Sequence, residues 1–253
     1  MQRYFVKESY RNQEVFAVTD ENYHHIVRVM RMKPEEELYL VFEDGIVVLG
    51  EITAIDEQTV SVRELSKETA DKELPIHVTI ACGLPKGDKL EWVVQKGTEL
   101  GSSSFIGFPA QNSIVKWDHK KLAAKTKRLI KIAQEAAEQS HRQRVPEIQL
   151  LEKEAQLLAM FSTYDKVLIA YEESAKQNER SKLVDVLTSL NTGARLLFVF
   201  GPEGGFSSEE IALFEQSGGI CCGLGPRILR AETAPLYALS AVSYQQELLS
   251  QGG

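Results

Sequence analysis

Short apolar and alternating runs occupy the first 73 residues, which predicts a small domain rich in β-strands. The expected strands are Tyr4–Val6, Glu14–Val18, Leu38–Phe42, Ile46–Ile52 and Thr59–Leu65. Such a series is typical of a small β-barrel. One helix is expected between the second and third strands, with Thr19 as its N-cap and with Ile26, Val29 and Met30 as its apolar stripe.

From Leu74 onward, apolar runs alternate with segments of helical periodicity, which predicts a mostly parallel sheet covered by helices on both faces. The expected strands are Ile76–Cys82, Phe105–Phe108, Lys166–Ala170, Leu196–Phe200 and Ile220–Cys222. The expected helices are Lys89–Leu100, His119–Ser140, Glu152–Phe161, Glu179–Leu190, Ser208–Gln216 and Pro235–Leu249. The polar stretch Lys67–Glu73 is the expected linker. We therefore predict two domains, a small β-barrel over residues 1–73 and an α/β domain over residues 74–253.

Charge is unevenly distributed along the chain of 253 residues. The net charge of −7 argues, taken alone, against a nucleic-acid partner. Residues 34–73, however, hold 12 acidic and 3 basic side chains, a balance of −9, whereas residues 116–144 hold 9 basic and 3 acidic ones, a balance of +6. Because salt screens charges over about 10 Å, a phosphate backbone responds to the local patch. The basic segment is either a phosphate-binding surface or the solvated face of a helix.

No apolar run approaches the roughly 18 residues that cross a bilayer, and the N-terminus lacks the apolar stretch of a signal peptide. We therefore expect a cytoplasmic protein that does not enter the membrane. Cys82, Cys221 and Cys222 lie in apolar strand-like runs, which predicts buried, reduced thiols. The Cys and His spacings match no zinc site, so no metal is expected.

The strongest local motif is the glycine-rich segment Gly201–Phe206, which follows an expected strand. The next helix opens with Ser207 and Glu210 at the spacing of a capping box. Open α/β sheets bind ligands at the carboxyl ends of their strands, and glycines let a ligand approach the backbone closely. Glu203 is the only charged residue of the segment. The alternative is a tight turn that binds nothing.

A second loop, Gly223–Pro235, follows the next expected strand. Its Gly-x-Gly start is not a dinucleotide-binding motif, because Ile228 stands where a third glycine is required, and no phosphate loop occurs in the chain. The loop carries Arg230 and Glu232 before the last expected helix. Glu232 is either chemically active or only complements the positive end of that helix, while Thr233 is expected to cap it. Two such loops after successive strands indicate a binding site.

Five sequence blocks together resemble a known family. They are HHIVRVMR at 24–31, GLPKGDKLEWVVQKGTELG at 83–101, KIAQEAAEQSHRQRVPEI at 131–148, GPEGGF at 201–206 and LGPRILRAETAPLYALSA at 224–241. They resemble the bacterial small-subunit ribosomal RNA (uracil-N3)-methyltransferases of the SPOUT superfamily, over nearly the whole chain. One position departs from the family pattern. Gln111-Asn112-Ser113 stands where the family usually has an arginine followed by serine. If that arginine contacts RNA, Asn112 weakens the contact, and Lys116 nearby is expected to share the task.

The resemblance implies a PUA-like or OB-like N-terminal barrel, and a SPOUT-type α/β domain that ends in a deep trefoil knot. It further implies a homodimer and a cofactor, S-adenosylmethionine, bound by the loops of the knot. The cofactor-binding residues that follow from it are Ala170, Tyr171, Glu172, Gly201, Pro202, Glu203, Gly204, Leu224, Gly225, Ile228 and Leu229. The implied reaction is methylation of N3 of a specific uridine in small-subunit (16S) ribosomal RNA, in rRNA modification and ribosome maturation.

Methyl transfer to N3 requires loss of the N3 proton. Deprotonation costs about 2.7 kcal/mol at neutral pH if the pKa of that proton lies about two units higher. We expect Arg230 to stabilise the uracil anion and to orient the base. Glu203 or Glu232 is expected to accept the proton, although a glutamate is a weak base unless it is desolvated.

Basic residues from both domains are expected to bind the RNA phosphates, with an affinity that falls as salt rises. They are Arg3, Arg28, Arg31, Lys86, Lys89, Lys116, Lys120, Lys121, Arg142 and Arg144. Trp92 is expected in the core, because it lies on a predicted helix. Two alternatives stay open: a related enzyme that methylates ribose or another base, and an RNA-binding module without activity.

Overall fold

The computed structural model describes residues 1–171 and 180–249, and the chain separates into two compact units. The first unit contains residues 1–73 and 137–144, and the second contains residues 74–136 and 145–253. A single boundary at Glu73 does not account for the segment 137–144. That segment belongs to the first unit because the Glu73 carboxylate accepts hydrogen bonds from the Arg142 guanidinium and from the main-chain N–H groups of Gln143 and Arg144.

The first unit is built on a five-stranded sheet. Its strands are β1 (Arg3–Phe5), β2 (Val15–Val18), β3 (Glu37–Val41), β4 (Val47–Ile55) and β5 (Val60–Lys67). They are ordered β1-β3-β4-β5-β2, with β1 parallel to β3 and every other pair antiparallel. The predicted small β-rich domain is confirmed. Its sheet is an open half-barrel, because β1 and β2 lie at opposite ends of the hydrogen-bonded order.

The helical segment of this unit differs from the predicted one. It begins as α1 (Asp20–His24) and continues as a π-helical turn over His25–Val29. Thr19 is the N-cap residue, as predicted, but its hydroxyl donates to the Asp20 carboxylate and makes no capping hydrogen bond to the helix. Ile26 is buried as expected, whereas Val29 and Met30 are exposed. The predicted stripe fails there because a π-helical turn holds more residues than an α-helical one and rotates later side chains away from the core.

The second unit contains the predicted parallel sheet, which has six strands where five were expected. Its strands are β6 (His77–Gly83), β7 (Ser104–Phe108), β8 (Glu147–Leu150), β9 (Lys166–Ala170), β10 (Arg195–Phe200) and β11 (Ile220–Cys222), in the order β11-β9-β10-β6-β7-β8. Strand β8 was not predicted. It lies at the sheet edge and alternates exposed with half-buried residues, so it lacks the apolar run of the buried strands.

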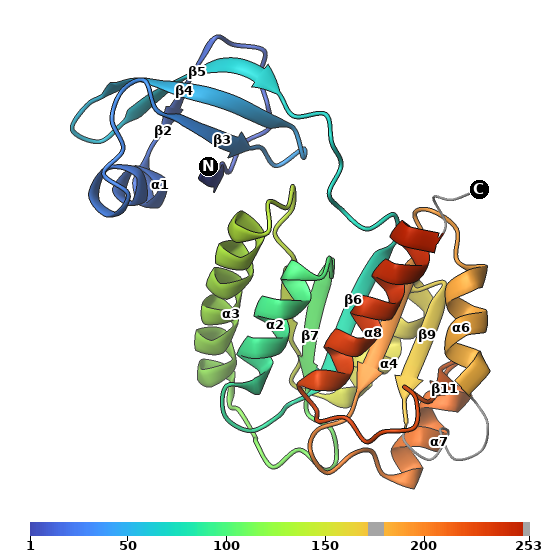
Figure 1. Ribbon diagram of the computed structural model, residues 1–253. Helices are drawn as coiled ribbons and strands as arrows, with labels where there is room; N and C mark the ends of the chain where they lie inside the picture. The colour runs from blue at the N-terminus through green and yellow to red at the C-terminus, as the bar shows by residue number, and fades with distance from the viewer. Residues whose placement is uncertain (172–179, 250–253) are drawn as a thin grey trace. The chain divides into compact units, whose positions relative to one another are not determined.

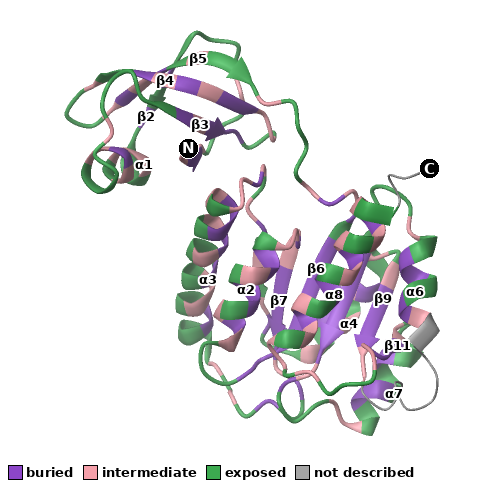
Figure 2. Cartoon of the chain, viewed as in Figure 1, coloured by how far each residue is buried: buried purple, intermediate pink, exposed green. Residues whose placement is uncertain are grey.

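Helices cover both faces of this sheet (Figure 1). The first face packs against α2 (Lys89–Glu99), α3 (His119–Gln139), α6 (Arg180–Ser189) and α8 (Thr233–Ser243). The second face packs against α4 (Glu154–Met160), a 3-10 turn (Phe161–Thr163) and α7 (Ser208–Gln216). The buried residues in Figure 2 follow the strands and the sheet-facing sides of these helices. The sheet therefore lies between two apolar layers, as its near-continuous apolar strands predict.

The last helix begins earlier and ends sooner than predicted. It starts at Thr233, after Glu232 as N-cap, so Pro235 lies in the first turn and Thr233 is not the cap. After Ser243 the chain continues as a π-helical segment over Tyr244–Leu249. The trefoil knot implied by the resemblance stays a prediction.

Three smaller expectations can be compared with the structure. Cys82, Cys221 and Cys222 are buried and form no disulfide, as predicted. Trp92 is 55% exposed, so its expected place in the core is wrong. Its neighbours Leu90 and Val93 take the buried side of α2. Within residues 1–171 and 180–249, no helix is long and apolar enough to cross a membrane.

Candidate active site

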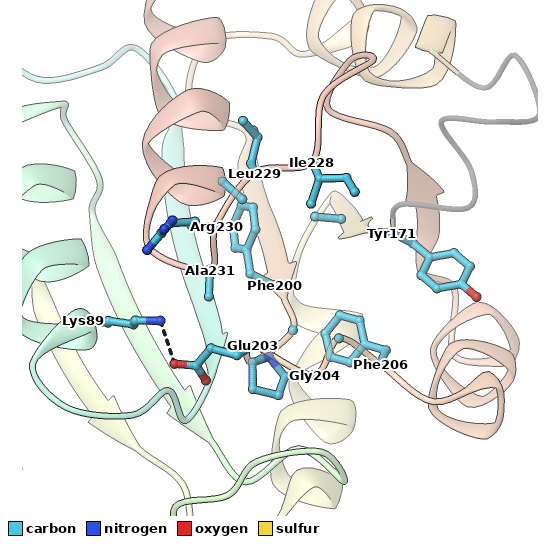
Figure 3. A pocket seen from close by; sticks show the side chains of 15 residues that line it. Lys89, Tyr171, Phe200, Glu203, Gly204, Phe206, Ile228, Leu229, Arg230 and Ala231 are labelled. Carbon is cyan, nitrogen blue, oxygen red and sulfur yellow. Dashed lines mark hydrogen bonds and ion pairs between the residues drawn. The ribbon is translucent and has the colours of Figure 1, made fainter.

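A cavity of about 620 Å³ lies at the carboxyl ends of β9 and β10. Three segments and Lys89 line it; the segments are the end of β9, the end of β10 with the glycine-rich loop after it, and the loop that leads into α8 (Figure 3). Its lining residues are Lys89, Ala170, Tyr171, Phe200, Gly201, Pro202, Glu203, Gly204, Gly205, Phe206, Ile228, Leu229, Arg230, Ala231 and Ala234. The segments meet because β9 and β10 are adjacent parallel strands, whose carboxyl ends share one edge of the sheet.

The path of the glycine-rich loop depends on glycine at two positions, Gly83 beneath the loop and Gly205 within it. A Cβ atom on Gly83 would lie 2.6 Å from Cδ of Pro202, so only glycine fits beneath the loop at that position. Gly205 has a φ of +66°, a conformation that glycine adopts without strain. The loop then enters α7 through the predicted capping box. The Ser207 N–H donates to Oε2 of Glu210 over 2.8 Å, and the Glu210 N–H donates to Oγ of Ser207 over 3.1 Å.

The loop after β7 holds the glycine-rich loop in place. The side-chain amide of Asn112 donates to the carbonyl oxygens of Gly204 and Gly205, each over 3.2 Å. The main-chain N–H of Gln111 donates to Oε1 of Glu210 over 2.7 Å. Asn112 therefore contacts the wall of the cavity, where the sequence predicted only a weakened RNA contact.

Lys89 lies between two carboxylates of the site. Its ammonium is 2.9 Å from Oε1 of Glu203, the contact drawn as a dashed line in Figure 3. The same ammonium is 3.5 Å from Oε2 of Glu232. The Lys86 main-chain N–H donates to the same Glu203 oxygen over 3.1 Å. Partial burial alone would raise the pKa of Glu203, but the Lys89 ammonium and the Lys86 N–H outweigh it and lower that pKa. The hydrogen bond to Glu203 in turn raises the pKa of Lys89.

Arg230 lines the same cavity from the loop before α8. Its side chain is exposed, and its main-chain carbonyl accepts hydrogen bonds from the N–H groups of Thr233 and Ala234 at the start of the helix. Within residues 1–171 and 180–249, no hydrogen bond or ion pair of its guanidinium is found. The backbone is thus fixed while the charge remains available to a ligand.

Most predicted cofactor residues lie together. Ala170, Tyr171, Gly201, Pro202, Glu203, Gly204, Ile228 and Leu229 all line the large cavity. Leu224 and Gly225 line a smaller cavity of about 110 Å³, which shares Ala170, Ile228 and Leu229 with the large one. Glu172 lies outside the described residues.

The cavity fits a nucleoside-containing cofactor in size and chemistry. Its volume falls in the range of small-molecule sites, which are mostly apolar and carry few polar anchors. Phe200 and Leu229 give apolar walls, and the glycines expose main-chain groups that can bind a base or a ribose. Within residues 1–171 and 180–249, no group of three or more His, Cys, Asp or Glu side chains could hold a metal ion.

Two of the predicted phosphate-binding residues are not on the surface. Arg3 is 1% exposed and pairs with Glu68 at 2.7 Å, and Arg142 is 3% exposed and pairs with Glu73. Their prediction as RNA contacts is wrong, because arginine spacing does not distinguish a buried ion pair from a surface charge. Lys89 faces the cavity. The other seven are exposed: Arg28, Arg31, Lys86, Lys116, Lys120, Lys121 and Arg144.

The site also contains contacts that the sequence reasoning missed. The pairing of Lys89 with Glu203 joins residues 114 positions apart, and the contacts of Asn112 with the glycine-rich loop span 92 and 93 positions. Spacing along the chain carries no signal for such pairs. The departure of Asn112 from the family pattern was the one sequence feature that marked this position as unusual.

Two family models match the chain. The model described as RNA methyltransferase domain matches residues 72–243, and the one described as RNA methyltransferase PUA domain matches residues 18–65. These matches assign the parallel α/β domain, with the cavity at its strand ends, and the PUA-like sheet before it to the class of RNA methyltransferases. The chain belongs to this family, and the resemblance seen in its motifs is confirmed.

Individual relatives agree with that assignment. The chain is 49% identical over 252 residues to ribosomal RNA small subunit methyltransferase E of Bacillus subtilis, covering 98% of both proteins. It is 31% identical to the enzyme of the same name from Synechocystis, covering 90% of this chain and 72% of that protein. Among solved structures, ribosomal RNA small subunit methyltransferase E from Neisseria gonorrhoeae bound to S-adenosyl methionine is similar with a TM-score of 0.83 and 28% identity. That likeness covers 96% of this chain and 97% of the other.

Proposed function

We propose that the protein is an S-adenosylmethionine-dependent methyltransferase that methylates N3 of a specific uridine in small-subunit (16S) ribosomal RNA, in rRNA modification and ribosome maturation. The observation that carries the proposal is the cavity at the ends of β9 and β10. It occurs in a chain that is 49% identical, over nearly its whole length, to a small subunit methyltransferase. The similar Neisseria structure is bound to the cofactor named here.

The cofactor would be held by the end of β9, by Gly201–Gly204 and by the loop carrying Ile228 and Leu229. When bound, S-adenosylmethionine supplies an electrophilic methyl group on a sulfonium. The protein orients the two reactants, and the main-chain groups of the glycine-rich loop are held by Asn112 while they do so. Holding reactants in a productive geometry is itself a large part of the acceleration of a two-substrate reaction.

Arg230 is the residue that stabilises the uracil anion. A guanidinium placed beside the uracil oxygens favours the deprotonated base and lowers the cost of losing the N3 proton. The free guanidinium and the fixed backbone of Arg230 support this role. Its exposed position also leaves it accessible to a base that enters from solvent.

Glu203 and Glu232 are the two carboxylates available to accept the proton. The contacts with Lys89 and Lys86 lower the pKa of Glu203, which weakens it as a base, but Glu203 lines the cavity. Oε2 of Glu232 is buried and lies 3.5 Å from the Lys89 ammonium, and Glu232 is not among the residues that line the cavity. Both carboxylates therefore stay candidates.

RNA is bound by the exposed cations of both units. The 1–73 domain contributes Arg28 and Arg31, and the 74–253 domain contributes the lysines at the start of α3. The RNA partner is either 16S rRNA or the assembled small ribosomal subunit, and both place the enzyme in the cytoplasm.

The active form is proposed to be a homodimer. Helices α2 and α8 pack against each other, and they expose the large apolar side chains of Trp92 and Tyr237. Tyr244 is exposed just beyond the end of α8. A monomer rarely exposes several large apolar side chains on two adjacent helices. Sedimentation of the wild-type chain and of Trp92→Lys tests the proposal, with a dimer expected for the first and a weaker dimer for the second.

The function is tested by transfer of a labelled methyl group. Small ribosomal subunits from a strain that lacks the enzyme, and naked 16S rRNA, are incubated with the protein and labelled S-adenosylmethionine. Label is expected in the 16S rRNA of at least one of these substrates. Cofactor binding measured by calorimetry without any label transfer to either substrate would instead favour an RNA-binding module that has lost its activity.

A further inference from the structure

The contacts of Lys89 give this residue a task different from phosphate binding. We propose that Lys89 is a positioning residue of the cofactor cavity, which holds the glycine-rich loop and the start of α8 at a fixed separation by pairing with Glu203 and Glu232. The proposal rests on the proposed function, because it concerns the site for S-adenosylmethionine.

The backbone of Lys89 is fixed by the core. Lys89 is the first residue of α2, and Leu90, Val93 and Val94 of that helix are buried beneath it. Gly97 lies one further turn along, where a Cβ atom would come within 2.6 Å of the Phe105 ring. Because the helix is packed this closely, the Lys89 ammonium reaches the loops from an immobile base.

The two partners of Lys89 come from the two loops that form the cavity walls. Glu203 lies in the loop after β10, and Glu232 is the N-cap of α8. Both loops also supply lining residues, including Gly204 on one side and Leu229 on the other. The single ammonium thus connects both walls. It lies 2.9 Å from Oε1 of Glu203 and 3.5 Å from Oε2 of Glu232.

Loss of this cation would leave two carboxylates facing each other. The Lys86 N–H would still hold Glu203, but the buried Oε2 of Glu232 has no hydrogen-bond partner within residues 1–171 and 180–249. Like charges that share a site repel, and a buried carboxylate without a counter-ion is costly. The walls would therefore separate, and the cavity would lose its shape for the cofactor.

The same geometry argues against a phosphate contact. The Lys89 side chain is 29% exposed and already has two carboxylate partners, so a phosphate would have to compete with both of them. Lys86 offers the matched comparison. Its side chain is exposed, and only its main-chain N–H contacts Glu203, which a side-chain substitution leaves in place.

Calorimetric titration of the full chain with S-adenosylmethionine tests the proposal, together with the salt dependence of 16S rRNA binding. Lys89→Met is expected to raise the cofactor Kd by about tenfold and to leave the salt slope unchanged, while Lys89→Arg stays within about threefold of wild type. Lys86→Met is expected to do the reverse, with an unchanged Kd and a lower salt slope. Thermal unfolding of each variant without cofactor shows whether it is folded.

Glu203→Gln gives a second test that keeps Lys89 in place. It is expected to raise the cofactor Kd, and Lys89→Met is expected to cost less in the Glu203→Gln background than alone, because contacting residues are energetically coupled. A wild-type cofactor Kd in Lys89→Met, or a lower salt slope with no change in Kd, would overturn the proposal. Failure of the wild-type chain to bind the cofactor would overturn the proposed function itself, and this proposal with it.

Discussion

Arg230 combines a fixed backbone with a free charge at the mouth of the cavity. If it stabilises the uracil anion, its contribution arises as the N3 proton is lost and not when the cofactor binds. We therefore expect Arg230→Ala to lower kcat by about 100-fold to 1000-fold, the effect of removing one group that stabilises developing negative charge. The Kd of S-adenosylmethionine is expected to change little. Single-turnover kinetics and calorimetry measure the two quantities.

Arg230→Lys is the matched variant, since it keeps the charge but loses the planar pair of donors. It is expected to recover part of the rate. Unchanged turnover in Arg230→Ala would remove this residue from its proposed role.

Asn112 shows how a departure from a family pattern can be accommodated. Its amide donates to the carbonyls of Gly204 and Gly205, a task that an arginine side chain can also perform with its N–H donors. Asn112→Ala is expected to raise the cofactor Kd about threefold to tenfold, the effect of losing hydrogen bonds of ordinary strength. Calorimetry measures the change.

Two further variants separate this contact from a general effect of the loop. Asn112→Arg is expected to bind the cofactor nearly as well as wild type. Gln111→Ala is expected to be neutral, because the main-chain N–H of Gln111, not its side chain, contacts Glu210. A neutral Asn112→Ala would contradict the account.

At the scale of elements, helices α4 and α7 are linked by a pair of carboxyl groups, Glu154 on α4 and Glu210 on α7. Burial, followed by the charge of Glu210, raises the pKa of Glu154 to about 7. Glu210 is buried and accepts hydrogen bonds from the main-chain N–H groups of Gln111 and Ser207. Lys116 and Glu209 line the cavity beside the pair. With its pKa raised to about 7, Glu154 is protonated below neutral pH.

This pair predicts a pH dependence of stability. The folded pKa of Glu154 exceeds its unfolded value, so the folded state binds the extra proton between about pH 4.5 and pH 7. The contribution of Glu154 to stability thus falls as pH rises through that window. Glu154→Gln is expected to raise the melting temperature by about 2–4 °C at pH 8 and to have little effect at pH 5.

Thermal unfolding at both pH values checks this prediction. Glu215→Gln, at an exposed position on α7, the helix that carries Glu210, is the control and is expected to show no such difference. Equal effects of Glu154→Gln at pH 5 and pH 8 would show that the two carboxyl groups are not coupled.

The start of α3 carries the exposed lysines Lys120 and Lys121. If both contact phosphates, Lys120→Ala with Lys121→Ala is expected to reduce the slope of log affinity against log salt by about 1.5, since each phosphate contact contributes about 0.7–0.9. Filter binding of 16S rRNA fragments over a range of salt concentrations measures the slope. Replacement of both by arginine should preserve it, and an unchanged slope in the alanine variant would identify α3 as merely a solvated face.

At the scale of the whole molecule, the alternation of apolar runs was sufficient to predict the two classes of domain and the parallel sheet. It missed β8, whose exposed edge position removes the apolar run on which the prediction depends. It also placed Val29 and Met30 inside, because a π-helical turn interrupts the period of 3.6 residues.

The candidate site was predictable where it is contiguous in sequence and less so where it is not. The glycine-rich loop and the loop before α8 each carry their own motif, and the parallel order of the strands brings them together. The pairing of Lys89 with Glu203 and the burial of Arg3 depend on tertiary packing. The charge and spacing of residues along the chain do not predict such packing.

The central claim, methylation of a uracil nitrogen in small-subunit ribosomal RNA, is tested most directly by identifying the modified nucleoside. Small subunits from a strain lacking the enzyme are treated with the protein and S-adenosylmethionine, and the 16S rRNA is digested and analysed by chromatography with mass spectrometry. The account predicts one new product, 3-methyluridine, formed about 100-fold to 1000-fold more slowly when Arg230→Ala replaces the wild-type protein. A methyl group on ribose or on another base would contradict it.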